Sequence, residues 1–99
     1  YDLQNEVVIG VPSKFALMQN YPNPFNPSTK INYELPITNY VSLKIFDITG
    51  KEVAQLVNQI QQAGYYAVDF NAASLSSGTY FYKLTSDKFS DVKKMVVVK

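Results

Sequence analysis

Residues 29–57 read TKINYELPITNYVSLKIFDITGKEVAQLV, and this stretch decides the fold class. Within residues 29–35, and again within residues 40–47, every second residue is a large apolar or aromatic one. A period of two predicts β-strands that bury one face and turn the other toward water. The turn that follows contains Gly50, which tolerates the positive φ of a tight turn, and residues 51–57 then return. The stretch therefore predicts one strand followed by a β-hairpin.

The same pattern of strand and turn continues on both sides, at the spacing of about 8 to 12 residues that is typical of all-β domains. Further strands are expected at residues 15–19, 65–71, 79–86 and 89–98. The sequence thus predicts an all-β fold, an immunoglobulin-like antiparallel β-sandwich of about seven strands, rather than a closed barrel. A corner of small residues precedes Tyr80, and we expect the Tyr80 hydroxyl to hydrogen-bond back to that corner.

A chain of 99 residues with 46% hydrophobic side chains is sufficient for one core, which we assign to residues 14–99. Residues 1–13 hold a short apolar cluster broken by Gly10 and Pro12. This composition predicts a linker from a preceding domain, although an edge strand would also fit. Because the sequence starts with Tyr1 and shows no signal peptide, we expect it to be a piece of a longer protein.

The charge pattern argues against a nucleic-acid partner. Nine lysines are scattered along the chain against eight acidic residues, the net charge is +1, and arginine is absent. Arginine is the side chain best suited to bidentate contacts with phosphate and guanine. In addition, no apolar run approaches the roughly 20 residues that span a bilayer, so no transmembrane segment is expected.

The side chains that most enzymes and metal sites use are missing. Neither Cys nor His occurs, which removes thiolate and imidazole as nucleophiles, bases and metal ligands. Asp47 and Asp69 could converge on a calcium ion in the fold, but the acidic residues form no calcium-binding or catalytic motif. Asp47 and Asp87 occupy turn positions, where an Asp side chain bonds backbone amides. We therefore predict no catalytic residue, metal or cofactor.

Eight tyrosines and six phenylalanines allow a second interpretation, carbohydrate binding, because sugars stack on exposed aromatic rings. Most of these aromatic residues fall on the alternating faces that fill a sandwich core. Tyr21, Phe25 and Tyr40 are assigned to loops and are expected to be exposed. They are the candidates for binding a glycan or cell wall.

The least generic stretch is NYPNPFNP at residues 20–27. Its prolines fix φ and lack amide donors, its asparagines can cap turns, and its two aromatic rings can anchor it on the end of the sandwich. It is either a stiff connection between strands or a preformed recognition loop. The residues of this proline-rich loop are Asn20, Tyr21, Pro22, Asn23, Pro24, Phe25, Asn26 and Pro27.

Five blocks in order carry a resemblance to a known family. They are FALMQNYPNPFNPSTKI, YELP, VSLKIFDITG, SGTYFYKL and KKMVVVK, at residues 15–31, 33–36, 41–50, 77–84 and 93–99. Together they resemble the type A C-terminal sorting domain of the type IX secretion pathway, over residues 12–99. An immunoglobulin-like domain of flagellar hook-capping proteins shares part of the pattern.

The resemblance implies a function in protein export. It implies a module that catalyses nothing itself and that an outer-membrane translocon recognises on a covalently linked N-terminal cargo. A surface peptidase then commonly removes it and attaches the cargo to lipopolysaccharide. The implied location is secreted or on the cell surface of a Gram-negative bacterium, reached through the periplasm. An accessory module that binds carbohydrate or cell wall, and a structural spacer, are the alternatives.

The resemblance also implies which residues carry the sorting signal. They are Gly78, Tyr80, Lys94, Met95, Val96, Val97, Val98 and Lys99. Residues 95–98 are expected to form a last, apolar edge strand flanked by lysines. An exposed edge can add its backbone hydrogen bonds to a partner's sheet, while the lysines oppose self-pairing.

Overall fold

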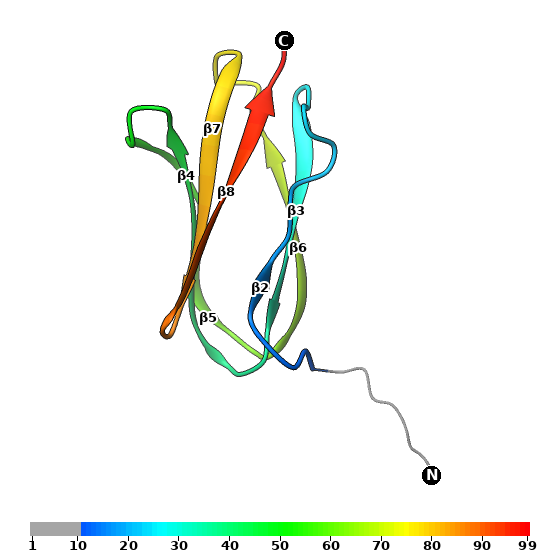
Figure 1. The fold of residues 1–99 in the computed structure, drawn as a ribbon, viewed down its shortest axis with the longest axis vertical. Helices are drawn as coiled ribbons and strands as arrows, with labels where there is room; N and C mark the ends of the chain where they lie inside the picture. Colours follow the sequence, from blue (N-terminus) through cyan, green and yellow to red (C-terminus); the bar gives the residue numbers. More distant parts are fainter. Residues whose placement is uncertain (1–10) are drawn as a thin grey trace.

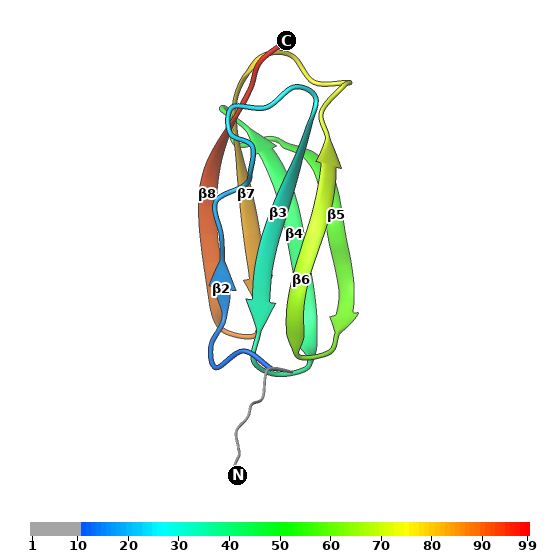
Figure 2. The same cartoon turned by 90° about the vertical axis from the view of Figure 1, so that its right-hand side faces the viewer.

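The structure is a computed structural model that describes residues 11–99. In this part of the chain there are seven strands and no helix: β2 (Ala16–Leu17), β3 (Ser28–Leu35), β4 (Asn39–Asp47), β5 (Glu52–Gln61), β6 (Gly64–Asn71), β7 (Gly78–Ser86) and β8 (Phe89–Val97). They form two antiparallel sheets that face each other, one ordered β2-β3-β6 and the other β5-β4-β7-β8 (Figures 1 and 2). The predicted β-sandwich is confirmed. Residues 1–10, most of the predicted linker, lie outside the described residues.

The alternation in the sequence builds the core between the sheets. On β3 and β4 the buried residues are every second one, and β7 follows the same rule from Tyr80 to Ser86. The largest fully buried side chains include Ile31, Tyr33, Leu35, Leu43, Ile45, Tyr82, Leu84 and Met95. Both sheets contribute, so burial of one face of each sheet stabilises the whole sandwich.

The hairpin of β4 and β5 is confirmed, and its turn has the expected chemistry. Gly50 has a φ of 90°, and the Asp47 carboxylate accepts hydrogen bonds from the backbone N–H groups of Thr49 and Lys51 at 2.9 and 3.0 Å. The Thr49 hydroxyl and these amides hold the pKa of the Asp47 carboxyl below its ordinary value. This aspartate therefore stabilises a turn.

Two strands differ from their predicted ranges by more than one residue at an end. β5 extends to Gln61 instead of ending at residue 57, because Ile60 and Gln61 pair with Tyr40 and Asn39 of β4. An edge strand can carry polar residues toward water, so composition alone did not mark this extension. β2 has two residues rather than five, since the proline-rich loop follows it closely.

Candidate functional site: the proline-rich loop and the last strand

The proline-rich loop lies along the outer edge of β8 and brings the two predicted groups of site residues together. The Phe25 N–H donates to the Val96 carbonyl at 3.0 Å, and the Val98 N–H donates to the Phe25 carbonyl at 2.9 Å. The Asn23 side-chain oxygen accepts from the Val96 N–H at 3.0 Å. Segments more than seventy positions apart in the sequence thus form one surface at the end of the sandwich where the chain reaches Lys99 (Figure 1).

This contact corrects the expectation of a free edge. β8 is the last strand of its sheet, as predicted, but outward backbone groups of its last part, at residues 94, 96 and 98, are already bonded. The loop hydrogen-bonds the backbone of Val96 and Val98, and the Gln19 side-chain amide donates to the Lys94 carbonyl at 2.6 Å. A partner strand could not add itself along residues 94–98 without displacing the loop, because each backbone group needs its own partner.

Two buried residues fix the loop to the sandwich. Phe25 is 3% exposed and packs edge-on against Phe70, with ring centroids 6.3 Å apart. Asn20 is 2% exposed, and its side-chain amide donates to the Thr29 hydroxyl at 3.0 Å and to the Pro22 carbonyl at 3.1 Å. Buried polar groups satisfied in this way fix one conformation of the loop.

The remaining loop residues are exposed at the surface. Their peptide geometry includes cis bonds before Pro22, Pro24 and Pro27. The exposed members are Tyr21, Pro22, Asn23, Pro24, Asn26 and Pro27. The loop therefore has a buried base and an exposed, proline-rich crest.

Tyr80 and Gly78 belong to the strand that supports the C-terminal segment. The Tyr80 hydroxyl donates to the Ser76 carbonyl at 2.9 Å, which is the predicted bond back to the corner. In the register of β7 and β8, Tyr80 lies opposite Met95 and Gly78 opposite Val97. Gly78 has a φ of 153°, a conformation that L side chains rarely adopt. Both residues are thus placed to support the C-terminal segment.

The six terminal residues divide between two faces. Met95 and Val97 are buried in the core, at 0% and 1% exposure. Lys94, Val96 and Val98 alternate with them and turn outward. Lys99 is tied to the corner before β7, where its ammonium donates to the Ala73 carbonyl at 2.8 Å and its N–H to the Ser77 hydroxyl at 3.0 Å.

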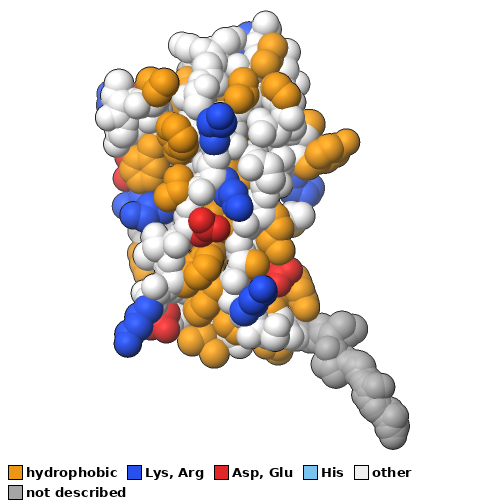
Figure 3. Space-filling model, in the orientation of Figure 1, with side chains coloured by type: hydrophobic (Ala, Val, Ile, Leu, Met, Phe, Trp, Pro, Cys, Tyr) orange, Lys and Arg blue, Asp and Glu red, His pale blue; other side chains and the backbone are white. Residues whose placement is uncertain are grey.

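The outer face of the four-stranded sheet adds residues that the sequence analysis missed. Phe81 lies between Phe46 and Lys94 in one row across three strands, and both rings are half-buried. Lys44 lies opposite Lys83 in the neighbouring row, and its ammonium is 3.4 Å from the Glu52 carboxylate. Figure 3 views the molecule from the edge where β8 lies and shows lysine side chains among hydrophobic ones there. The strict alternation of these outward residues with core residues along each strand was the signal in the sequence that could have identified this face.

The structure corrects the expected exposure of the loop aromatics. Phe25 is buried, and Tyr40 belongs to β4 rather than to a loop, although it is 49% exposed. Tyr21 is exposed, as expected, at 81%. Asp69 pairs with the Lys30 ammonium at 3.0 Å. Within residues 11–99 no group of three or more acidic residues is placed to hold a metal ion.

The fold and this surface define a class of small β-sandwich in which a loop from the beginning of the domain hydrogen-bonds the outer edge of the last strand. The family model of the secretion system C-terminal sorting domain matches residues 19–98, and the chain belongs to this family. No curated protein matches the chain. Membership identifies a sorting signal for type IX secretion with a secreted or cell-surface role in bacteria, and members are in general non-catalytic.

Across residues 11–99 there is no helix long and apolar enough to cross a bilayer. The family implies involvement with the type IX secretion machinery.

Proposed function

We propose that residues 14–99 form a sorting domain that carries an N-terminal cargo, joined through the linker at residues 1–13, to the surface of a Gram-negative bacterium. The cargo crosses the periplasm, and the outer-membrane translocon then binds the surface built from the loop and β8. A surface peptidase removes the domain and attaches the cargo. The observation that supports this most directly is the bonding of Phe25 to Val96 and Val98, which joins the family's blocks into one surface.

The recognition surface consists of the outward residues around the end of β8. Lys94, Val96 and Val98 alternate outward, and Phe81 lies beside Lys94 in the sheet. Lys44 lies opposite Lys83 on the same outer face, and Glu52 offsets one of the two charges at 3.4 Å from the Lys44 ammonium. With Lys94, the face therefore keeps an excess of positive charge. Its partner should present apolar and acidic side chains.

Four other residues implied in the signal support the strand that carries this surface. Met95 and Val97 fill the core, while Tyr80 and Gly78 form the corner and the paired strand. We assign them to folding of the signal rather than to contact with the translocon.

The test is an export assay with matched variants. Residues 1–99 are fused behind a fluorescent reporter that has an N-terminal export signal, in a host with type IX machinery. The double variant Lys94→Glu/Val96→Thr changes charge and polarity on the outer face and keeps a β-branched residue in the strand. We expect surface fluorescence to fall by at least about tenfold, because a reversed charge opposes an acidic partner.

The control carries the same two kinds of substitution outside this surface. Val11 and Lys14 are exposed and precede β2 of the other sheet, so Val11→Thr/Lys14→Glu leaves the proposed surface intact. Its surface fluorescence should equal that of the parent. Normal delivery of Lys94→Glu/Val96→Thr, with an unchanged melting temperature, would refute the proposed surface. It would mean that another part of the domain is recognised.

A further inference from the structure

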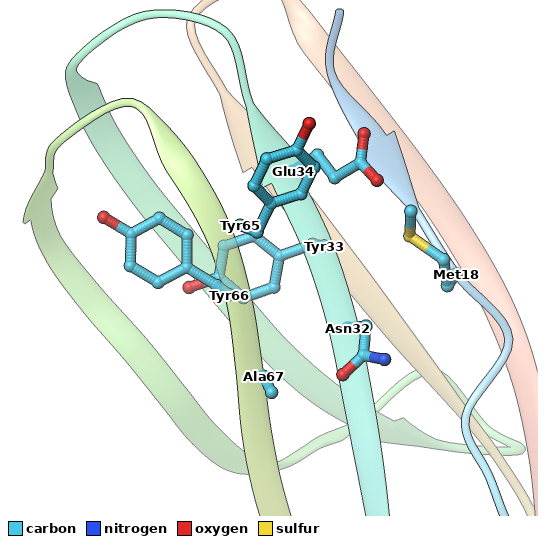
Figure 4. A pocket seen from close by; sticks show the side chains of 7 residues that line it. All are labelled: Met18, Asn32, Tyr33, Glu34, Tyr65, Tyr66 and Ala67. Atoms are coloured by element: carbon cyan, nitrogen blue, oxygen red, sulfur yellow. The ribbon is translucent and has the colours of Figure 1, made fainter. Parts of the chain in front are cut away.

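The outer face of the three-stranded sheet has a hollow of about 300 Å³ that the sorting function does not use. Tyr65 and Ala67 of β6, Asn32 and Glu34 of β3, and Met18 after β2 line it (Figure 4). It lies on the opposite sheet from β8, so a ligand here would not compete with the recognition surface.

The register of the strands explains the shape of this hollow. Tyr65 lies opposite Glu34, and Ala67 lies opposite Asn32. On the other side of Asn32, the Met18 N–H donates to the Asn32 carbonyl at 3.0 Å. The methyl group of Ala67 therefore forms a low floor between taller side chains. The next pair along these strands is the ion pair of Lys30 and Asp69, which bounds one end.

Tyr33 and Tyr66 also line the hollow, but they alternate with the outward residues and stack on each other with ring centroids 5.2 Å apart. The outward lining combines one aromatic ring, that of Tyr65, with two hydrogen-bonding side chains. Tyr65 is 59% exposed, so its ring is open to a ligand, and Figure 4 shows it standing beside Glu34. Met18 and Ala67 offer apolar contact, while the Asn32 amide can donate to and accept from hydroxyl groups and the Glu34 carboxylate can accept from them. A ring with one apolar face and a rim of hydroxyls matches this arrangement, and that description fits a sugar.

The local charge selects among sugars. Glu34 and Asp69 lie on this face with Lys30, which leaves one carboxylate in excess. An anionic glycan would be repelled, because its charges would meet the Glu34 carboxylate at short range. Tyr21 and Tyr40 are also exposed, but neither lines the hollow, so neither has polar partners arranged around its ring in this way.

We propose that this hollow binds one hexopyranose unit of a neutral glycan. Tyr65 stacks on the apolar face of the sugar ring, and Asn32 and Glu34 hydrogen-bond its hydroxyls from the middle strand. The domain would then hold a surface polysaccharide on one sheet while the other sheet carries the sorting surface. This activity is separate from export.

The test measures binding of defined oligosaccharides to the full chain of 99 residues by calorimetry. Cellohexaose and mannohexaose are the neutral probes, and hexagalacturonate is the anionic one. We expect at least one neutral probe to bind with a Kd at or below about 1 mM, and the anionic probe to bind at least about tenfold more weakly. Tyr65→Ala should weaken binding of the neutral probe by about tenfold or more.

Two further variants separate the hollow from general effects. Ala67→Leu fills the floor while Tyr65 stays, and because Ala67 is exposed this change does not overpack the core; it should abolish binding. Tyr40→Ala removes an exposed tyrosine from the other sheet and should leave the Kd unchanged. Failure of both neutral probes to bind at about tenfold above 1 mM would overturn the proposal. So would neutral binding that survives Ala67→Leu, or equal binding of hexagalacturonate.

Discussion

At the scale of single residues, one hydroxyl group fixes the start of the proline-rich loop. The Tyr82 hydroxyl accepts from the Asn20 N–H at 2.8 Å and donates to the Met18 carbonyl at 2.7 Å. The alternation in β7 was sufficient to predict that Tyr82 is a core residue. These two bonds could not be predicted, because they join residues more than sixty positions apart and depend on the packing of two sheets.

Tyr82 and Tyr33 make the stability of the domain sensitive to alkaline pH. Burial raises the pKa of each phenol from 10.0 to about 12, against an opposing effect of hydrogen bonds with Gln61 at Tyr33 and with Asn20 at Tyr82. The folded state therefore favours the neutral phenols. Their stabilisation is complete below pH 10.0 and is lost as the pH rises toward 12.

We expect the free energy of unfolding to fall by up to about 1.4 kcal/mol per pH unit for each of these tyrosines in that range. Urea unfolding at about pH 9 and about pH 11 measures the difference between the two conditions. Tyr82→Phe is the control, since it removes one of the two titrating groups and should roughly halve the fall. A free energy that is independent of pH across this window would contradict the prediction.

At the scale of elements, the hairpin of β4 and β5, the turn at Gly50 and the outlines of β3, β6, β7 and β8 could be read from alternation and turn residues. The burial of Phe25 could not be predicted from such patterns. An aromatic residue between prolines gives no periodic signal, so the loop was expected to expose it, yet it packs on Phe70 and bonds to β8. Contacts between distant segments depend on the assembled sheets rather than on local pattern.

The bond from the Val96 N–H to the Asn23 side chain gives a test at this scale. Asn23→Ala removes the acceptor, which is exposed, so the core should remain intact. We expect hydrogen exchange at the Val96 amide to become about 2- to 10-fold faster, which corresponds to loss of one ordinary hydrogen bond. Nuclear magnetic resonance measures the rate.

Asn26→Ala is the matched control in the same loop. Asn26 is also exposed, and its side chain makes no hydrogen bond to β8 in the described part of the chain. Its replacement should leave the exchange at Val96 unchanged. Equal rates in the Asn23 variant and the parent would mean that the loop does not hold this part of β8 in solution.

At the scale of the whole molecule, folding and signal cannot be separated by truncation. Deletion of residues 94–99 removes Met95 and Val97 from the core along with the outward residues. Loss of a buried Met side chain alone destabilises by about 2–5 kcal/mol, and a domain of this size is stable by only about 5–15 kcal/mol. Failed export of such a truncation would therefore not identify a recognition residue.

We expect this deletion to lower the melting temperature by at least about 20 °C, as followed by circular dichroism, since about 5 kcal/mol or more is lost. Removal of residues 98–99 alone deletes two exposed side chains and should lower it by much less. Melting of the longer deletion within a few degrees of the parent, on the order of 1 kcal/mol, would show that the end of β8 contributes little to the fold.

The bonding of the loop to residues 96 and 98 also has a meaning for quality control during synthesis. The loop leaves the ribosome before the backbone groups that it binds are made, because they follow it by about seventy residues. A cargo whose translation stops before β8 is complete would lack the Val96 carbonyl and the Val98 amide, and its loop would have no partner. Under the proposed function, such an unfinished protein would present no assembled surface to the translocon. Only cargo whose domain has been translated through β8 would then qualify for export.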